Sequence, residues 1–144
     1  MQRKIYQRRQ SGFTLIEVMV VIVILGVLAV LVVPNVVGKV GSSKIKTTKV
    51  TLSTVANELK TYQMDNGHYP TAQEGGLDAL VHKPATAKNY PSNGYLEKFP
   101  QDSWGNDLQY VTPGANGKPF DLYSFGADGK QGGEGDDADI YYEP

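Results

Sequence analysis

The sequence predicts an α+β fold in which one long N-terminal helix packs on a small three-stranded antiparallel sheet. An apolar run without a charged residue extends from Val18 to Val33. Apolar residues with helical spacing return after Gly41, and three short strand-like segments follow in the second half of the chain. The chain has 144 residues, which leaves room for one such helix and one domain of roughly 80 to 100 residues.

The N-terminal segment combines a basic leader with an apolar run of membrane-spanning length. Residues 1–12 contain four basic residues and no acidic residue. Residues 13–34 are long enough to cross the roughly 30 Å hydrocarbon core of a bilayer as a helix. The basic leader predicts a cytoplasmic N-terminus and export of residues 35–144, although lysines that follow the span weaken this orientation.

A small residue that could mark a cleavage site lies before the apolar run. A secretory signal peptide is cut after its apolar segment, at small residues in an A-x-A pattern, and no convincing site of that kind follows Val33. Cleavage between Gly12 and Phe13 would instead remove only the leader and keep the span. An uncleaved anchor is the alternative interpretation.

Glu17 is an acidic residue inside the predicted span. A carboxylate there costs roughly 2.5 to 3.5 kcal/mol on insertion scales, and such residues are usually paired or functional. Cleavage would place a free α-amine on Phe13, four residues before Glu17 on the same helix face, in the same subunit or a neighbour. Pairing between neighbours would set the axial register of stacked helices. A solvated Glu17 at the headgroup boundary is the alternative.

The helix is expected to continue into the exported domain. Its second half carries an apolar stripe with spacings of seven, three, four and three residues, which indicates an amphipathic helix facing a core. Pro34 in the interior predicts a kink or a melted stretch, and Asn66-Gly67 predicts the end of the helix. The stripe consists of Ile45, Leu52, Val55, Leu59 and Tyr62.

The rest of the domain follows from local signals. Residues 71–74 have capping-box spacing and predict a short second helix that ends near Lys83-Pro84. Residues 85–100 are expected to form an irregular covering loop, and Trp104 to fill core or loop packing. The expected strands are residues 108–112, 120–125 and 138–142, with a turn at residues 113–117.

The acidic, glycine-rich segment of residues 128–139 is the main candidate for a binding site in the part of the chain that is expected to be exported. It carries five carboxylates, which would repel one another if unpaired. Calcium binds six to eight oxygens in flexible geometry, and glycine allows backbone carbonyls to turn inward. The spacing is not that of an EF-hand, because Lys130 and Gly132 stand where ligands should be. From these residues alone, a calcium site and a solvated acidic loop remain alternatives.

Several other classes of function are not supported. The chain has no cysteine and therefore no disulfide, and the strongly acidic C-terminal part argues against nucleic acid as a partner. His68 and His82 lack metal-binding spacing, the glycine-rich segment lacks the ending of a P-loop, and no nucleophile motif is present. An enzyme is not expected.

The residues after the leader resemble a known processing site. Gly12-Phe13-Thr14-Leu15-Ile16-Glu17 closely resembles the class III leader site of the type IV pilin-like superfamily, where a prepilin peptidase cuts after the glycine and methylates the new N-terminal phenylalanine. Three later segments resemble the major (G-type) pseudopilins of the type II secretion system. Ser103 and Phe125 depart mildly from the proline and leucine usual there. The three segments are Asp102–Asn106, Pro119–Ser124 and Phe125–Gly129.

The resemblance implies a type IV pilin-like fold and a structural subunit rather than an enzyme. Such a subunit is anchored by one helix in the bacterial inner membrane with its domain in the periplasm, and it polymerises into a pseudopilus whose growth drives export of folded proteins. The implied partners are other copies of the chain, minor pseudopilins, the prepilin peptidase, the inner-membrane platform with its cytoplasmic ATPase and, indirectly, the outer-membrane secretin.

The resemblance also assigns roles to residues. Cleavage and N-methylation involve Gly12 and Phe13, and assembly involves Thr14, Glu17 and Pro34, with the segment near Pro34 unwinding as subunits enter the fibre. Two other functions stay open: the major pilin of a type IV pilus, and a membrane-anchored calcium-binding module that never polymerises. The implied calcium ligands are the Asp128 and Asp136 carboxylates, the Phe125 carbonyl and, more weakly, Asp137.

Overall fold

The computed structural model describes residues 12–144, except for the side chains of residues 31–38. The predicted leader, apart from Gly12, lies outside the described residues. The chain divides into two compact units, Met1–Lys39 and Val40–Pro144, and each is described by itself.

Helix α1, Leu15–Asn66, contributes to both units. It runs without a break through Pro34, so of the kink or melted stretch expected there, the melted stretch is not present. One proline removes a single backbone hydrogen bond, and the helix continues on either side. The predicted end is confirmed: Gly67 takes a left-handed φ of 86° and its N–H donates to the Gln63 carbonyl at 2.8 Å. Glycine adopts this conformation without the steric penalty of a Cβ.

The described part of the first unit exposes its apolar side chains. Phe13 is 89% exposed, and the large apolar residues from Leu15 to Val30 are also exposed. By length and hydropathy, no helix among the described residues qualifies as a membrane span. Residues 31–34 of the span predicted from the sequence are among those whose side chains are not described.

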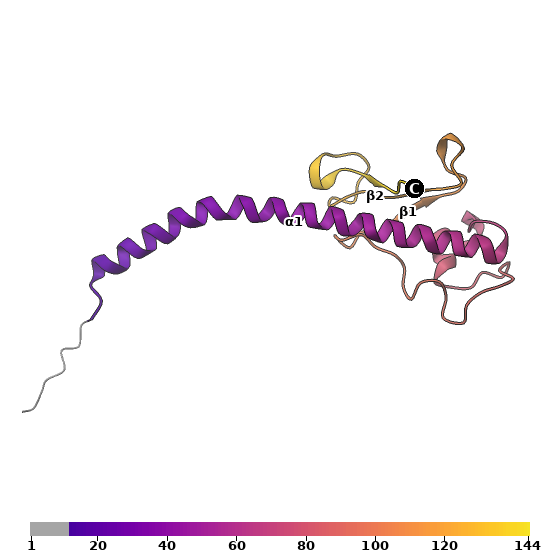
Figure 1. Cartoon of the computed structure of the whole chain (residues 1–144), viewed down its shortest axis with the longest axis horizontal. Coiled ribbons are helices and arrows are strands. Elements are labelled where there is room, and N and C mark those ends of the chain that lie inside the picture. Colours follow the sequence, from indigo (N-terminus) through magenta and orange to yellow (C-terminus); the bar gives the residue numbers. More distant parts are fainter. Residues whose placement is uncertain (1–11) are drawn as a thin grey trace, which may run out of the picture. The chain divides into compact units, whose positions relative to one another are not determined.

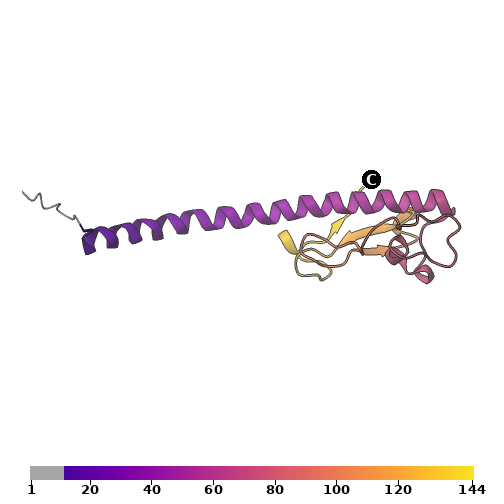
Figure 2. The same cartoon turned by 90° about the horizontal axis from the view of Figure 1, so that it is seen from below.

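The second unit holds the core, and its sheet has the predicted three antiparallel strands in the order β1-β2-β3. Strand β1 is Gln109–Val111, β2 is Asp121–Ser124 and β3 is Ile140–Tyr141. The strands lie along the C-terminal half of α1 (Figures 1 and 2). The predicted stripe of α1 is confirmed, with Ile45 partly buried and the other four residues buried. The buried core is Leu52, Val55, Ala56, Leu59, Tyr62, Leu77, Ala79, Leu80, Leu108, Phe120, Leu122 and Ile140.

The expected second helix is instead two 3-10 helices, η1 (Ala72–Glu74) and η2 (Gly76–Leu80). The predicted capping box at Thr71 and Glu74 is present. Gly75 then adopts a left-handed φ of 94°, which ends the helical path and starts a second short one. The prediction was wrong because two consecutive glycines follow the capping box, and glycine lowers the cost of leaving the helix.

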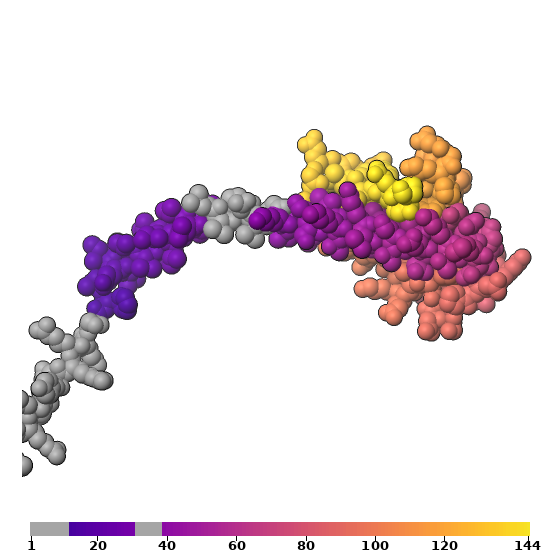
Figure 3. All heavy atoms as spheres, in the orientation of Figure 1, coloured from indigo at the N-terminus to yellow at the C-terminus, as the bar shows by residue number. Residues whose placement is uncertain are grey.

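The remaining segments cover the core. Residues 85–100 contain no helix or strand, as predicted, and the space-filling view shows this part of the chain on one side of α1, with the C-terminal residues on the other (Figure 3). Trp104 is partly buried against the core and Lys44 lies over its ring, which confirms a packing role. Two further 3-10 helices, η3 (Ala115–Gly117) and η4 (Gly135–Asp137), lie in the connections between strands.

Candidate functional site

The predicted processing site lies in a non-helical segment immediately before α1. Gly12, Phe13 and Thr14 have no regular secondary structure, and all three are exposed. A methyl group at Gly12 would meet nothing within 4 Å. The Gly12–Phe13 peptide bond is therefore accessible, as a peptidase substrate must be.

Glu17 closes the first turn of α1 together with Thr14. Its Oε2 accepts hydrogen bonds from the Thr14 backbone N–H at 2.8 Å and from the Thr14 hydroxyl at 3.1 Å. In return, the Glu17 N–H donates to the Thr14 hydroxyl oxygen at 3.3 Å. This is a capping box, which satisfies N–H groups that have no partner inside the helix. The sequence signal, threonine followed three residues later by glutamate, was present, but Glu17 was interpreted as a partner of the Phe13 amine or as a solvated residue at the headgroup boundary.

The C-terminal loop, residues 125–139, connects β2 to β3 in a hairpin. Ser124 and Ile140 are paired at its base, and the Ala127 N–H donates to the Asp136 carbonyl at 2.8 Å. Gly126 has a φ of 74°, and a Cβ there would lie 2.8 Å from the Asp136 carbonyl oxygen. Only glycine allows the two arms of the loop to approach this closely.

The carboxylates of this loop take separate positions. Asp128 Oδ1 accepts the Lys130 N–H and Asp139 Oδ1 accepts the Gly132 N–H, each at 3.0 Å. The Asp136 carboxylate packs on Gly41 of α1, where a methyl group would overlap it. Among the described residues, no three acidic, histidine or cysteine side chains converge on one point. The hydrogen bond between Ala127 and Asp136 thus joins the two arms of the loop that carry the predicted calcium ligands. In this conformation, however, the carboxylates of these ligands do not meet at one point.

A buried polar network lies beneath the loop, and the sequence did not reveal it. Asp102 is 7% exposed. Its Oδ1 accepts the N–H groups of Trp104 and Asn106, both at 2.9 Å, and its Oδ2 accepts the Ser124 hydroxyl at 2.6 Å. The Asn106 side chain donates from Nδ2 to the Gly126 carbonyl at 2.8 Å. Asp102 and Asn106 come from one of the segments quoted for the family resemblance, and Ser124 and Gly126 come from the other two. Only the fold brings these segments together.

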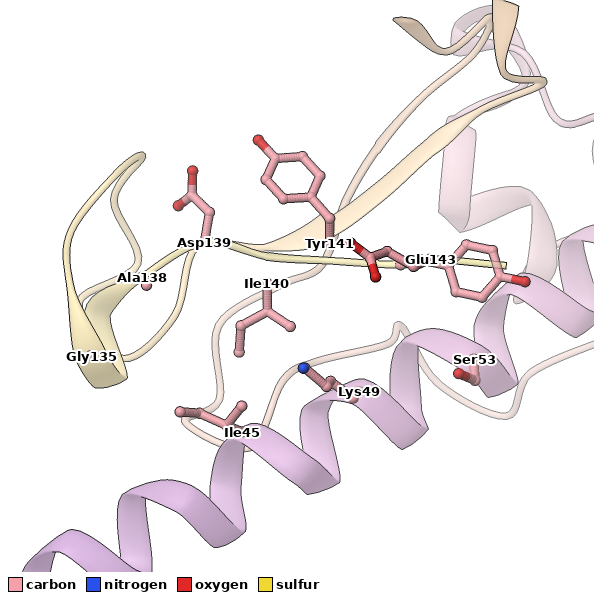
Figure 4. Close-up of a pocket in the computed structure, with 10 residues that line it drawn as sticks. Ile45, Lys49, Ser53, Gly135, Ala138, Asp139, Ile140, Tyr141 and Glu143 are labelled. Atoms are coloured by element: carbon pink, nitrogen blue, oxygen red, sulfur yellow. The ribbon is translucent and has the colours of Figure 1, made fainter. Parts of the chain in front are cut away.

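A shallow cleft of about 530 Å³ separates α1 from the C-terminal strand. Figure 4 shows Ile140 pointing toward Ile45 and Lys49 of α1, while Asp139 and Tyr141 point away from the helix. This alternation is that of a strand with one face toward the core.

A second polar cluster surrounds Glu74, whose side chain is 6% exposed. The carboxylate accepts hydrogen bonds from the Thr71 N–H at 2.8 Å, from the Thr86 hydroxyl and from His68 Nε2 at 3.0 Å. Burial alone would raise the pKa of Glu74, but the hydrogen bonds from Thr86, Thr71 and His68 outweigh it and lower this pKa to about 2. The hydrogen bond to Glu74 raises the pKa of His68, against the effect of burial.

Comparison with known proteins identifies the family. The sequence profile described as "Type II secretion system (T2SS), protein G" matches residues 35–143, and the profile of the prokaryotic N-terminal methylation motif matches residues 7–33. The chain belongs to the type II secretion system protein G family. It is therefore a major pseudopilin, a structural subunit of the pseudopilus, and members of this family are not enzymes.

Individual relatives agree with this assignment. Type II secretion system core protein G of Pseudomonas aeruginosa is 53% identical over 93% of this chain and 95% of its own length. The protein of the same name from Vibrio cholerae is 47% identical over 92% of this chain and 91% of its own length. The crystal structure of the major pseudopilin from the type 2 secretion system of enterohaemorrhagic Escherichia coli matches with a TM-score of 0.62 and 36% identity, and the match covers 76% of this chain and 95% of that one.

Proposed function

We propose that the subunit is cut between Gly12 and Phe13, methylated at Phe13, and then polymerised through residues 13–34 into a periplasmic fibre whose growth exports folded proteins. The observation that supports this most is the exposure of every large apolar side chain from Leu15 to Val30 on the described helix. A helix that is apolar on all sides needs apolar surroundings, either lipid or other helices. Before assembly those surroundings are the inner membrane, and in the fibre they are neighbouring subunits.

Glu17 is the residue that selects the register of assembly in this proposal. In the precursor, the Thr14 hydrogen bonds both reach Oε2, so Oε1 is free to accept a donor from another subunit. Cleavage creates such a donor, the charged α-amine of Phe13. A carboxylate that is fully paired only with a neighbour in the correct register penalises other registers, because a buried unpaired charge is costly.

The motor and the membrane complex are separate proteins in this proposal. The chain contains no nucleotide-binding motif of the P-loop kind, so a cytoplasmic ATPase would supply the energy through an inner-membrane platform. A prepilin peptidase processes the subunit, minor pseudopilins join the fibre, and the outer-membrane secretin provides the exit.

Two measurements test assembly. Mass spectrometry of the mature N-terminus should show N-methylated Phe13 in cells with the prepilin peptidase and an intact Met1 leader in cells without it. Glu17→Ala should then remove cross-linked multimers while membrane insertion persists, and the matched control Glu97→Ala, an exposed glutamate of the domain, should assemble normally. Multimers of Glu17→Ala at wild-type levels would show that this carboxylate does not direct assembly, and the absence of multimers from the wild-type protein would favour the membrane-anchored module that never polymerises.

We further propose that calcium orders the C-terminal loop, with the Asp128 and Asp136 carboxylates and the Phe125 carbonyl as ligands and Asp137 as a weaker one. The donor chemistry fits, because hard oxygen ligands and glycine-rich backbone suit this ion. The Ala127–Asp136 hydrogen bond brings the two arms together, and binding requires the Asp136 carboxylate to leave Gly41.

The calcium proposal has a direct test on the full-length protein in detergent. At a calcium concentration of about 100 Kd, binding to the folded state alone should add about 2.7 kcal/mol to the free energy of unfolding. Asp128→Ala should abolish this gain. Glu134→Ala, an exposed carboxylate of the same loop outside the proposed ligand set, should retain it. An equal response to calcium in Asp128→Ala and wild type would refute the site.

A further inference from the structure

Asn106 connects the loop between Gln101 and Asp107 to the C-terminal loop. Its Nδ2 donates to the Gly126 carbonyl at 2.8 Å, and a longer contact of 3.5 Å reaches the Ala127 carbonyl. These two carbonyls lie between the proposed ligands Phe125 and Asp128. The side chain therefore fixes the backbone of the arm that carries both of them.

The backbone of Asn106 is itself held rigidly. Its N–H donates to Asp102 Oδ1 at 2.9 Å, and its carbonyl accepts the Asp102 N–H at 2.8 Å. The neighbouring Gln101 and Asp107 form an antiparallel bridge. Two backbone contacts to the same buried residue leave the side chain little freedom to change its direction.

Asp102 reaches the same arm by a second route. Its Oδ2 accepts the Ser124 hydroxyl at 2.6 Å, and the Ser124 oxygen accepts the Gly126 N–H at 3.0 Å. Both Asp102 and Ser124 are buried. Ser124 thus holds the N–H of Gly126, and Asn106 holds its carbonyl. Both backbone polar groups of this residue are therefore fixed by one hydrogen-bond network.

Local packing agrees with a tight fit around the Asn106 side chain. Gly129 has a φ of 66°, and a Cβ there would approach Asn106 Oδ1 to 3.1 Å. The side chain is half-buried. Residues 126–129 of the C-terminal loop therefore lie beside the amide on both its oxygen and its nitrogen side.

We infer that Asn106 is a positioning residue of the C-terminal loop: its side-chain amide holds residues 125–128 in the conformation that a divalent cation requires. This inference rests on the proposed calcium site. A flexible glycine-rich arm pays an ordering cost when it binds a ligand, and a preformed arm avoids much of that cost. An aspartate cannot replace Asn106, since its carboxylate has no donor and would face carbonyl oxygens.

The test uses the full-length chain in detergent with the variants Asn106→Ala and Asn106→Asp. The matched control is Asn89→Ala, which removes a side-chain amide that donates to the Asp65 carbonyl at 3.1 Å elsewhere on the domain. Hydrogen exchange of the Ala127 N–H is measured in chelator, and calcium affinity is measured by titration calorimetry. Asn106→Asp keeps the size of the side chain and serves where Asn106→Ala does not fold.

The inference expects both Asn106 variants to raise exchange at Ala127 and to weaken calcium binding by about tenfold, the effect of losing one hydrogen bond of typical strength. Asn89→Ala should change neither quantity. Unchanged exchange at Ala127, or faster exchange with unchanged calcium affinity, would overturn the inference. If wild type itself binds no calcium, the calcium proposal fails, while exchange at Ala127 still decides whether Asn106 holds the arm.

Discussion

The two halves of helix α1 share one backbone geometry but bury their side chains in different ways. From Leu15 to Val30, the large apolar side chains are all exposed. From Ile45 to Tyr62, a single stripe is buried against the sheet and the covering loops. The first half depends on surroundings outside the chain, and the second half creates its own.

The largest effect is expected from truncating the buried stripe. Leu59 is fully buried, so Leu59→Ala should lower the free energy of unfolding by about 2 to 5 kcal/mol through lost transfer energy and a cavity. Leu25→Ala is the matched change on the exposed half and should leave unfolding of the domain unchanged. Urea unfolding of the full-length chain in detergent, followed by tyrosine circular dichroism, measures both. Equal effects of the two substitutions would show that the halves do not differ in this way.

A smaller effect is expected just beyond the end of α1, where Glu74 of η1 is hydrogen-bonded to His68. Glu74→Gln should destabilise the domain by about 2 kcal/mol at pH 6, because a buried charge-assisted network is lost. The exposed pair of Asp78 and His82 provides the control, and Asp78→Asn should cost well under about 1 kcal/mol.

The same cluster predicts a pH dependence with a definite sign. The pKa of Glu74 is lowered from 4.5 to about 2, so its contribution is present above pH 4.5 and is lost as the pH falls toward 2. The pKa of His68 is raised from 6.5, so its contribution is complete below pH 6.5 and is lost as the pH rises through the raised value. Glu74→Gln should flatten both limbs of the curve of unfolding free energy against pH. A curve that keeps the wild-type shape would assign this dependence to other groups.

On the exposed half, removal of the helix cap should have a local effect. Thr14→Ala removes the hydroxyl that accepts the Glu17 N–H, at a cost of about 1 kcal/mol to the first turn. Faster amide exchange confined to the start of α1 is expected, with unchanged unfolding of the domain. Thr51→Ala, where the hydroxyl donates to the Thr47 carbonyl within the helix, should not alter exchange at the N-terminus. Global destabilisation by Thr14→Ala would contradict the independence of the two halves.

The smallest effect is expected near the boundary of the compact units. Gly41→Ala should gain up to about 1 kcal/mol of helix propensity, and this gain is offset as the Asp136 carboxylate is displaced from its place on Gly41. The net change should stay within about 1 kcal/mol, while the NMR signals of Asp136 shift. A loss well above this value would mean that the C-terminal loop cannot move away from the helix.

The helix and the sheet followed from local patterns. The spacing of Leu52, Val55 and Leu59 predicted which face is buried, because a helix repeats every 3.6 residues. The strands were found within one or two residues of their predicted ends, although each is shorter than expected. Two local predictions differed from the fold. Helix α1 continues through Pro34 without a melted stretch, and the left-handed conformations of the two glycines after the capping box divide the expected second helix into two 3-10 helices.

The candidate sites were predicted unequally. The residues of the proposed processing site are contiguous, so the sequence alone presents them together. The ligands proposed for calcium were named from the acidic loop and the family resemblance, but the network of Asp102, Asn106 and Ser124 was not. Those side chains come from segments about 20 residues apart, and no local pattern reports a contact between them.

Ser103 is a further residue whose contact with a distant segment the sequence did not predict. The family resemblance led us to expect a proline there, and the departure looked mild from the sequence. In the fold, the Ser103 N–H donates to the hydroxyl oxygen of Thr48 at 3.2 Å, and the Thr48 hydroxyl donates to the Ser103 oxygen at 3.1 Å. Thr48 is fully buried in α1, and a proline has no N–H to donate.

Local sequence patterns were enough to predict the order of the elements, the buried face of α1 and the N-terminal motif, because each depends on residues close together in the chain. The folded chain was needed to find the partners of Asp102 and Asn106, the place of Asp136 on Gly41 and the cluster around Glu74. The physical reason is that hydrogen bonds and close approaches between distant segments are set by packing distances, which residue type and local spacing do not encode.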